Sequence, residues 1–238
     1  MSVVDVKNLV KFYGDVKAVK GITFNIEKGE IFGLIGPNGA GKTTTLRILS
    51  TLLLMTEGSI KIMDFDLSKK PDEIRKIISY LPEDAGAYKN LSGIRYLEFI
   101  ANFFGEEKAE KMVAKGVEIA DLKDHIKDKV DTYSKGMKRR LLVGRALMTD
   151  PRLTILDEPT SGLDVNNAQE IRNIIKNTAK KGTTVLLSSH NMLEVEYLCD
   201  RIALIDDGLI VEEGKPKSLM EKYKASNIEE VFTKVVKN

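Results

Sequence analysis

The stretch IFGLIGPNGAGKTT (residues 31–44) decides the fold of this chain. Its first five residues form a continuous apolar run, which is typical of a strand buried in a parallel sheet. A glycine-rich loop follows, and then a helical pattern with Leu46, Leu49, Leu52 and Leu53 on one side. A helix N-terminus presents unpaired N–H groups and the positive end of the helix dipole, so this order predicts an anion site at the loop.

The loop also fits the spacing G-x-x-x-x-G-K-[ST], which is the P-loop of nucleotide-binding proteins. Its glycines let backbone N–H groups surround phosphate oxygens, Lys42 should reach the β- and γ-phosphates, and the Thr43 hydroxyl should hold Mg²⁺. The alternative is a glycine-rich turn without a ligand, which the flanking strand and helix disfavour. The residues that we expect to contact nucleotide are Gly36, Asn38, Gly39, Gly41, Lys42, Thr43 and Thr44.

Further apolar runs of the same kind lie at 153–156, 183–188 and 202–205, and helical patterns separate them. This alternation predicts an α/β sheet wrapped by helices. The first thirty residues indicate short strands with a turn at 27–29, and Asp207-Gly208 predicts a hairpin turn.

The middle of the chain, from about 91 to 149, shows helical patterns and no strand pattern. One helix begins at Ser92 and ends at Gly105, and two more cover roughly 107–121 and 136–149. We therefore expect a helical insertion within the α/β domain.

Composition limits the class of protein. Hydrophobic residues make up 42% and charged residues 30%, which argues against disorder. The 37 Lys and Arg nearly balance the 35 Asp and Glu, so the chain as a whole lacks the charge typical of nucleic-acid binding. Cys199 is the single cysteine, which excludes an intrachain disulfide and favours a reducing cytosol. Since no signal-peptide core and no membrane-spanning apolar run occurs, we expect a cytoplasmic protein.

Two acids follow the apolar run at 153–156, in LTILDEPTSGLD (153–164). Ligands of open parallel sheets bind at the carboxyl ends of the strands, where Asp157 and Glu158 fall. Acid pairs alone often cap helices, so the pair gains its meaning from the P-loop. Beside a bound nucleotide, Asp157 is placed to bind Mg²⁺ and Glu158 to orient or deprotonate the attacking water.

The stretch YSKGMKRRL (133–141) allows three interpretations. It fits the solvated face of a helix, a patch that binds nucleic acid, or a loop that touches a nucleotide held by another chain. Its own residues do not choose among them.

Together these motifs resemble the nucleotide-binding subunit of an ATP-binding cassette (ABC) transporter. The resemblance rests on the P-loop, ILDEPTSGLD and SSH (188–190), and it covers nearly the whole chain. It implies a P-loop NTPase core with a mainly parallel sheet, an N-terminal antiparallel β subdomain and an inserted α-helical subdomain. One ABC ATPase domain would then span 1–238, with the core at 1–90 and 150–215, the helical subdomain at 91–149 and a helical tail at 216–238.

The resemblance also implies roles for single residues. Tyr13 would stack on adenine, His190 would contact the γ-phosphate, and Asp164 would lie across a dimer interface. Where most of the family have a glutamine, ISYLPED (78–84) offers Glu83, whose carboxylate can still ligate Mg²⁺. The expected catalytic residues are Lys42, Glu83, Glu158 and His190, and the expected metal ligands are Thr43, Glu83 and Asp157.

The family signature, usually LSGGQ, corresponds here to YSKGM (133–137). Ser134 and Gly136 are kept, and the resemblance implies that they face the γ-phosphate of ATP on the opposite subunit. It thus favours the third interpretation, with the basic residues of 138–147 on a solvated or phosphate-facing surface.

The implied substrate is ATP with Mg²⁺, and the implied active form is a homodimer or a heterodimer with another ABC ATPase subunit. The chain would dock from the cytoplasmic face of the membrane onto separate permease subunits, with Tyr88, Leu91 and Tyr96 near that contact. The alternative for Leu91 and Tyr96 is ordinary packing of a helix. Three features resemble those of cassettes that serve ABC-2 type exporters. They are Glu83, the signature YSKGM and the ending NIEEVFTKVV (227–236). The alternative is a soluble ABC ATPase acting on nucleic acid or ribosomes, but no long coiled-coil insertion and no second cassette is present.

Overall fold

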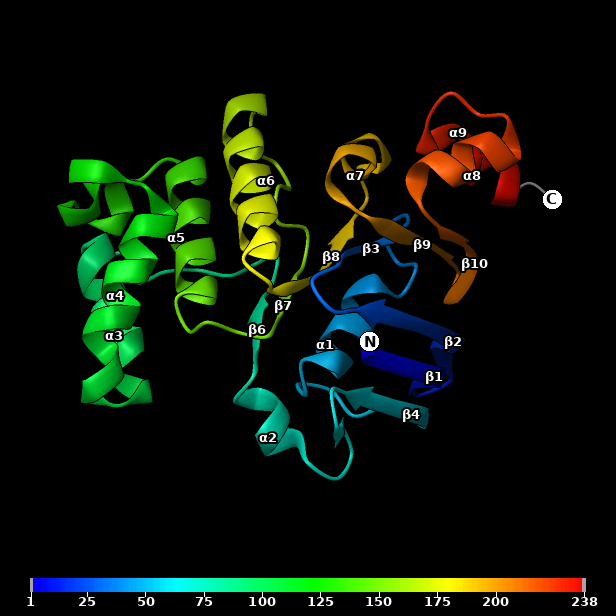
Figure 1. The fold of residues 1–238 in the computed structure, drawn as a ribbon, viewed down its shortest axis with the longest axis horizontal. Helices are drawn as coiled ribbons and strands as arrows, with labels where there is room; N and C mark the ends of the chain where they lie inside the picture. The colour runs from blue at the N-terminus through cyan, green and yellow to red at the C-terminus, as the bar shows by residue number, and fades with distance from the viewer. Residues whose placement is uncertain (1, 237–238) are drawn as a thin grey trace.

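The computed structural model describes residues 2–236, apart from the side chain of Glu194, and contains two sheets and a separate group of helices (Figure 1). The larger sheet has the strand order β10-β9-β3-β8-β7-β6, and β6, β7, β8, β3 and β9 run parallel. The expected α/β class with a mainly parallel sheet is confirmed. The strands are β3 (Ile31–Ile35), β6 (Ile78–Leu81), β7 (Leu153–Leu156), β8 (Thr184–Ser189), β9 (Arg201–Asp206) and β10 (Leu209–Gly214).

The central strand β3 is buried along its whole length, and its side chains alternate between two cores. Ile31 and Ile35 join the core shared with the helical part, whereas Phe32 and Leu34 join the core beneath the smaller sheet. A strand covered on both faces has no polar side to display, which explains its continuous apolar sequence.

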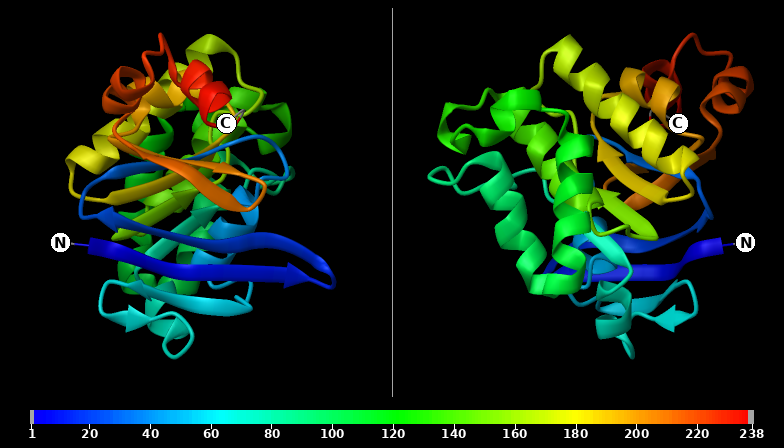
Figure 2. Two further views of the ribbon diagram at one scale, coloured as in Figure 1. Left: turned by 90° about the vertical axis from the view of Figure 1, so that its right-hand side faces the viewer. Right: turned by 60° about the vertical axis from the view of Figure 1, so that its left-hand side comes forward.

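The smaller sheet is antiparallel, in the order β2-β1-β4-β5. The expectation of short strands was wrong here, because β1 and β2 are twelve residues each and run across the domain (Figure 2). Register shifts between them interrupt the in–out alternation, so each strand looks like several short ones in the sequence. The strands are β1 (Ser2–Tyr13), β2 (Val16–Glu27), β4 (Glu57–Ile62) and β5 (Phe65–Asp66).

The helix after the P-loop is shorter than expected. It ends at Leu49, because Thr51 adopts φ +62°, which is outside the helical region. Beyond this point Leu52 is 65% exposed. Leu52 and Leu53 therefore do not extend its apolar face. The helices around the sheets are α1 (Lys42–Leu49), α2 (Pro71–Arg75), α6 (Val165–Lys180), α7 (Met192–Leu198), α8 (Pro216–Tyr223) and α9 (Ile228–Val236).

The helical insertion has the three expected helices and lies to one side of the sheet (Figure 1). Helices α4 and α5 approach closely at Gly144, where an added Cβ would lie 2.6 Å from the Gly116 carbonyl oxygen. Its elements are α3 (Gly93–Ala101), η1 (Asn102–Phe104), α4 (Glu106–Ala120), η2 (Lys123–Lys127), η3 (Val130–Thr132) and α5 (Lys135–Leu147).

The C-terminal helix α9 packs on this same chain. Ile228 and Val231 are fully buried, and the Asn227 side chain accepts from the Glu230 amide at 2.8 Å, as its capping pattern predicts. Over residues 2–236, every helix is too short or too polar to span a bilayer.

Candidate nucleotide and hydrolysis site

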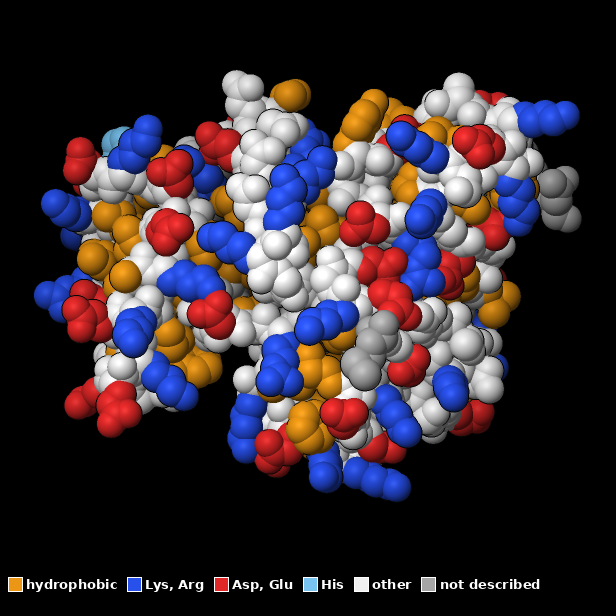
Figure 3. All heavy atoms as spheres, viewed as in Figure 1, with side chains coloured by type: hydrophobic (Ala, Val, Ile, Leu, Met, Phe, Trp, Pro, Cys, Tyr) orange, Lys and Arg blue, Asp and Glu red, His pale blue; other side chains and the backbone are white. Residues whose placement is uncertain are grey.

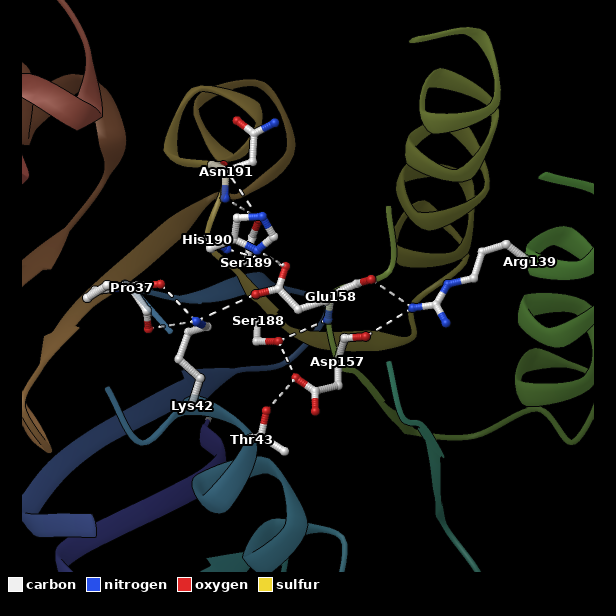
Figure 4. Close-up of polar contacts among 11 residues, drawn as sticks. Pro37, Lys42, Thr43, Arg139, Asp157, Glu158, Ser188, Ser189, His190 and Asn191 are labelled. Carbon is white, nitrogen blue, oxygen red and sulfur yellow. Dashed lines mark hydrogen bonds and ion pairs between the residues drawn. The ribbon is translucent and has the colours of Figure 1, made fainter. Parts of the chain in front are cut away.

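Three neighbouring strands of the larger sheet end at one edge, and each delivers part of the site (Figure 4). The P-loop follows β3, Asp157 and Glu158 follow β7, and His190 follows β8. Parallel strands place their carboxyl ends together, so these segments meet although they are far apart in the sequence.

The P-loop conformation depends on its glycines. Gly41 caps α1 at φ +101°, and an added Cβ there would lie 2.7 Å from the Ala18 carbonyl oxygen. A Cβ on Gly36 would overlap the Ile205 carbonyl oxygen, and Gly39 adopts φ +83°. The backbone at these positions is therefore free to turn its N–H groups toward a phosphate, as the motif predicts.

Lys42 lies at the centre of the site with only 6% of its surface exposed. Its Nζ donates to the carbonyl oxygens of Gly36 (2.8 Å) and Pro37 (3.0 Å). It also lies 3.5 Å from Glu158 Oε1. A buried ammonium needs such partners, and phosphate oxygens can replace them.

Asp157 is buried, and hydroxyl groups surround its carboxylate. Its Oδ1 accepts from Ser188 Oγ at 2.5 Å and from Thr43 Oγ1 at 3.3 Å. The Tyr80 hydroxyl lies 3.5 Å from Oδ2. Burial, and then the charge of Asp157, raises the pKa of Tyr80 to about 12, so this phenol stays neutral at physiological pH.

Glu158 adopts the left-handed conformation, at φ +47°, which costs a non-glycine residue about 1–3 kcal/mol. Its carboxylate lies between two basic groups, because Oε2 is 2.8 Å from His190 Nδ1 and Oε1 faces Lys42. Among the described residues, Oε1 is a buried oxygen that accepts no hydrogen bond. The site thus holds a buried carboxylate oxygen whose capacity to accept a hydrogen bond is unused by the described residues.

Ser188 was missing from the expected site residues. Its hydroxyl accepts from the Glu158 amide at 3.0 Å and donates to Asp157, so one side chain fixes both acids. Its sequence signals are its place at the end of an otherwise apolar strand and its membership of the SSH motif (188–190).

Arg139 was placed on a solvated or phosphate-facing surface, and the structure contradicts this. The side chain is 8% exposed, and within residues 2–236 its hydrogen bonds go to backbone carbonyl oxygens, including those of Asp157 and Glu158 (Figure 4). Its neighbour Arg140 is also engaged, in an ion pair with Glu170 at 3.0 Å. Isolated basic triplets are common on helices, so the sequence did not reveal these internal contacts.

Ser134 and Gly136 lie at the start of α5, outside this network. Exposed Ser134 caps the helix by accepting from the Met137 amide at 3.2 Å. Gly136 is buried, and a Cβ there would overlap the Asn167 side chain of the same chain. Asn167 also donates to Asp164, the residue that caps α6. Packing against Asn167 of the same chain therefore explains why residue 136 is a glycine.

The remaining predicted residues also lie apart from the network. Tyr13 ends β1 with 47% of its surface exposed, and Glu83 is exposed on the loop after β6. Within residues 2–236, the Glu83 carboxylate is not hydrogen-bonded to Lys42, Asp157 or Glu158. Tyr96 is only 3% exposed and packs in the core, which agrees with the alternative of ordinary helix packing.

The chain is similar to known ATP-binding proteins along nearly its whole length. The family model for ABC transporters matches residues 19–161. The linearmycin resistance ATP-binding protein LnrL of Bacillus subtilis is 38% identical over 93% of this chain and 72% of its own length. The Nod factor export ATP-binding protein I of Burkholderia orbicola is 35% identical over 96% of this chain and 76% of its own length.

Solved structures agree. An ATP-binding subunit of an ABC transporter superposes with a TM-score of 0.86 at 26% identity, over 98% of this chain and 99% of its own. An ATP-binding cassette in a dimeric post-hydrolysis state, bound to ADP and Pi, superposes with a TM-score of 0.78 at 28% identity. The match covers 89% of this chain and 98% of that one. The fold and the site therefore define a P-loop ATPase of the cassette type. The chain belongs to the ABC transporter family, as an ATP-binding subunit with ATPase activity.

Proposed function

We propose that this chain powers an exporter of the ABC-2 type, and that Glu158 is the general base for ATP hydrolysis. The observation that carries the chemistry is the buried Glu158 Oε1, which accepts no hydrogen bond from the described residues and lies beside Lys42. Export is supported by similar proteins whose names specify Nod factor export or resistance to linearmycin or daunorubicin/doxorubicin.

In the proposed reaction, the P-loop N–H groups and Lys42 hold the phosphates of ATP. Glu158 orients a water whose oxygen attacks the γ-phosphorus, while the bond to the β–γ bridging oxygen breaks and ADP leaves. The proton of the water passes to Glu158 and then to the released phosphate. His190 keeps the Glu158 carboxylate in place through the 2.8 Å contact with its Nδ1.

Thr43 and Asp157 fit a magnesium ion, because a hydroxyl and a carboxylate 3.3 Å apart are the hard oxygen donors that it prefers. Among the described residues, no group of three or more His, Cys, Asp or Glu side chains is arranged to hold a metal ion. Oxygen atoms of phosphate and water would therefore supply the other ligands. Glu83 would join this set only if its loop moved inward. When bound, the ion would neutralise charge on the β- and γ-phosphates.

A dimer would complete the site. We infer that Ser134, exposed at the start of α5, contacts ATP held by a second ABC ATPase subunit, which is a copy of this chain or a sister chain. Asp164 and exposed Val165, at the start of α6, would lie near that contact. The dimeric state of a similar cassette supports this arrangement.

The permease subunits would dock beside the helical part, from the cytoplasmic side of the membrane. A groove of about 270 Å³ separates α2 and β6 from α3 and α4, and its rim is visible as a hollow in Figure 3. Tyr88, Phe99 and Phe103 form an exposed chain of edge-to-face aromatic contacts that runs from the loop before α3 to η1. Such a cluster is a suitable surface for a partner helix, and Tyr88 and partly buried Leu91 belong to the face that we proposed from the sequence.

Sedimentation of Glu158→Gln with MgATP, alone and combined with Ser134→Arg, tests this proposal. If Glu158 is the base, the single variant retains ATP and forms a dimer, and the added Ser134→Arg returns it to a monomer. Wild-type hydrolysis by Glu158→Gln would reject the proposed base. A monomer in both cases, with hydrolysis lost, would mean that Ser134 does not close on ATP held by a copy of this chain. A sister cassette or a permease would then be the missing half.

A further inference from the structure

The buried guanidinium of Arg139 uses all of its hydrogen-bonding capacity on the backbone. An arginine has five N–H donors, and each one here meets a carbonyl oxygen. Nε donates to Pro159 (2.7 Å), Nη1 to Pro82 and Glu83 (both 3.3 Å), and Nη2 to Asp157 (3.0 Å) and Glu158 (2.8 Å). One side chain of the helical part therefore links five peptide groups of the sheet edge.

These five carbonyls belong to two loops, which follow the neighbouring strands β6 and β7. One loop carries Glu83 and the other carries Glu158. Between them in the sequence lies the whole helical insertion, from which Arg139 reaches back on α5. A displacement of α5 would therefore pull on both loops at once.

The contact acts on the peptide that carries the proposed base. The Glu158 carbonyl oxygen accepts from Arg139 Nη2 and also from the Ser161 amide at 3.1 Å. Because Glu158 is held in the left-handed conformation, its backbone relaxes unless the surroundings hold it. Relaxation would rotate the carboxylate away from Lys42 and His190.

The charge of Arg139 is retained in this buried place. Burial lowers the pKa of its guanidinium, and the charges of Glu83, Asp157 and Glu158 oppose that effect. A lysine could also stay charged, but its three donors could not serve five carbonyls on two loops.

We propose that Arg139 is a positioning residue, which couples the place of the helical part to the orientation of Glu158 and so sets the rate of hydrolysis without binding ATP. This inference rests on the proposed role of Glu158 as the base.

Steady-state kinetics and equilibrium ATP binding of Arg139→Lys test it. We expect kcat to fall about tenfold or more, since a displacement of about 1 Å in a catalytic group can cost a hundredfold. The dissociation constant for ATP should stay within about threefold of wild type, because the P-loop contacts are intact. In the Glu158→Gln background, Arg139→Lys should change kcat by less than about twofold, because Arg139 acts through Glu158.

Amide exchange supplies a second readout, with Arg140→Gln as the matched control. That arginine is the next residue on α5 but contacts Glu170 and the Asp121 carbonyl instead. Exchange at 83–85 and 158–161 should quicken in Arg139→Lys, and Arg140→Gln should leave both exchange and kcat unchanged.

Wild-type kcat in folded Arg139→Lys would overturn the inference while leaving Glu158 as the base. Equal losses of kcat and ATP affinity would also overturn it, by assigning Arg139 to general integrity. If Arg139→Lys does not fold, Arg139→Gln is measured in the same way, and failure of both to fold would assign the residue to stability alone. Unchanged hydrolysis in Glu158→Gln would instead reject the proposed function itself.

Discussion

The strand-edge site and the start of α5 differ in how far one chain completes them. At the strand edge, Lys42, Asp157 and Glu158 are buried and partnered by groups of the same chain. At the start of α5, Ser134 is exposed and its hydroxyl only caps the helix. The first region is pre-organised for chemistry, whereas the second has an open face. This difference is what a composite site formed by two chains requires.

The largest effect should come from removing the base. We expect Glu158→Gln to lower kcat by a factor of about a hundred or more, as for loss of a general base, while ATP binding persists. Steady-state ATPase assays and nucleotide titrations measure the two quantities. Glu170→Gln, which breaks only the ion pair with Arg140, should keep wild-type kcat. A comparable loss in that control would mean that the assay reports general damage.

Gly36→Ala should affect the first region through packing. The added Cβ would overlap the Ile205 carbonyl oxygen, which cannot turn aside, so we expect about 1–3 kcal/mol of destabilisation and loss of ATP binding. Chemical denaturation and nucleotide titration measure both effects. Gly39→Ala is the comparison, since its Cβ would meet open space and its cost comes only from φ +83°. Equal effects of the two changes would refute the steric explanation.

Gly136→Ala separates internal packing from a role toward a partner. The Cβ would overlap the Asn167 side chain, so stability should fall by about 1 kcal/mol. Adding Asn167→Ala should restore stability, as a double-mutant cycle in thermal or chemical denaturation would show. If the double variant is stable but still fails to dimerise with MgATP in the Glu158→Gln background, Gly136 also contacts the partner. Additive destabilisation would contradict the packing explanation.

The smallest effect concerns Tyr80 beside Asp157. Because the native environment raises the pKa of this phenol to about 12, its contribution to stability is present below pH 10 and is lost as pH rises from 10 through 12. Wild type should therefore lose more unfolding free energy over this range than Tyr80→Phe, as measured by urea denaturation. Parallel curves for the two proteins would show that Tyr80 is not buried beside the carboxylate.

Most of the strand edge could be predicted from the sequence. The buried strands before the P-loop and before Asp157 were recognisable because strands covered on both faces show uninterrupted apolar runs. Motif spacing then brought Lys42 and Asp157 to one edge, and the resemblance to ABC cassettes added His190. The long strands β1 and β2 could not be recognised, because their register shifts break the alternation that marks a strand.

By itself, the sequence determined the fold class, the P-loop and the order of the groups around it, because these depend on short-range patterns and spacings. Tertiary structure alone decided that Tyr96 is buried, that Gly136 packs against Asn167, and that Arg139 joins two loops to the helical part. The partners of Arg139 are carbonyl oxygens 18 to 57 residues away. Since every residue carries a carbonyl group, no sequence pattern marks which ones a distant guanidinium will find.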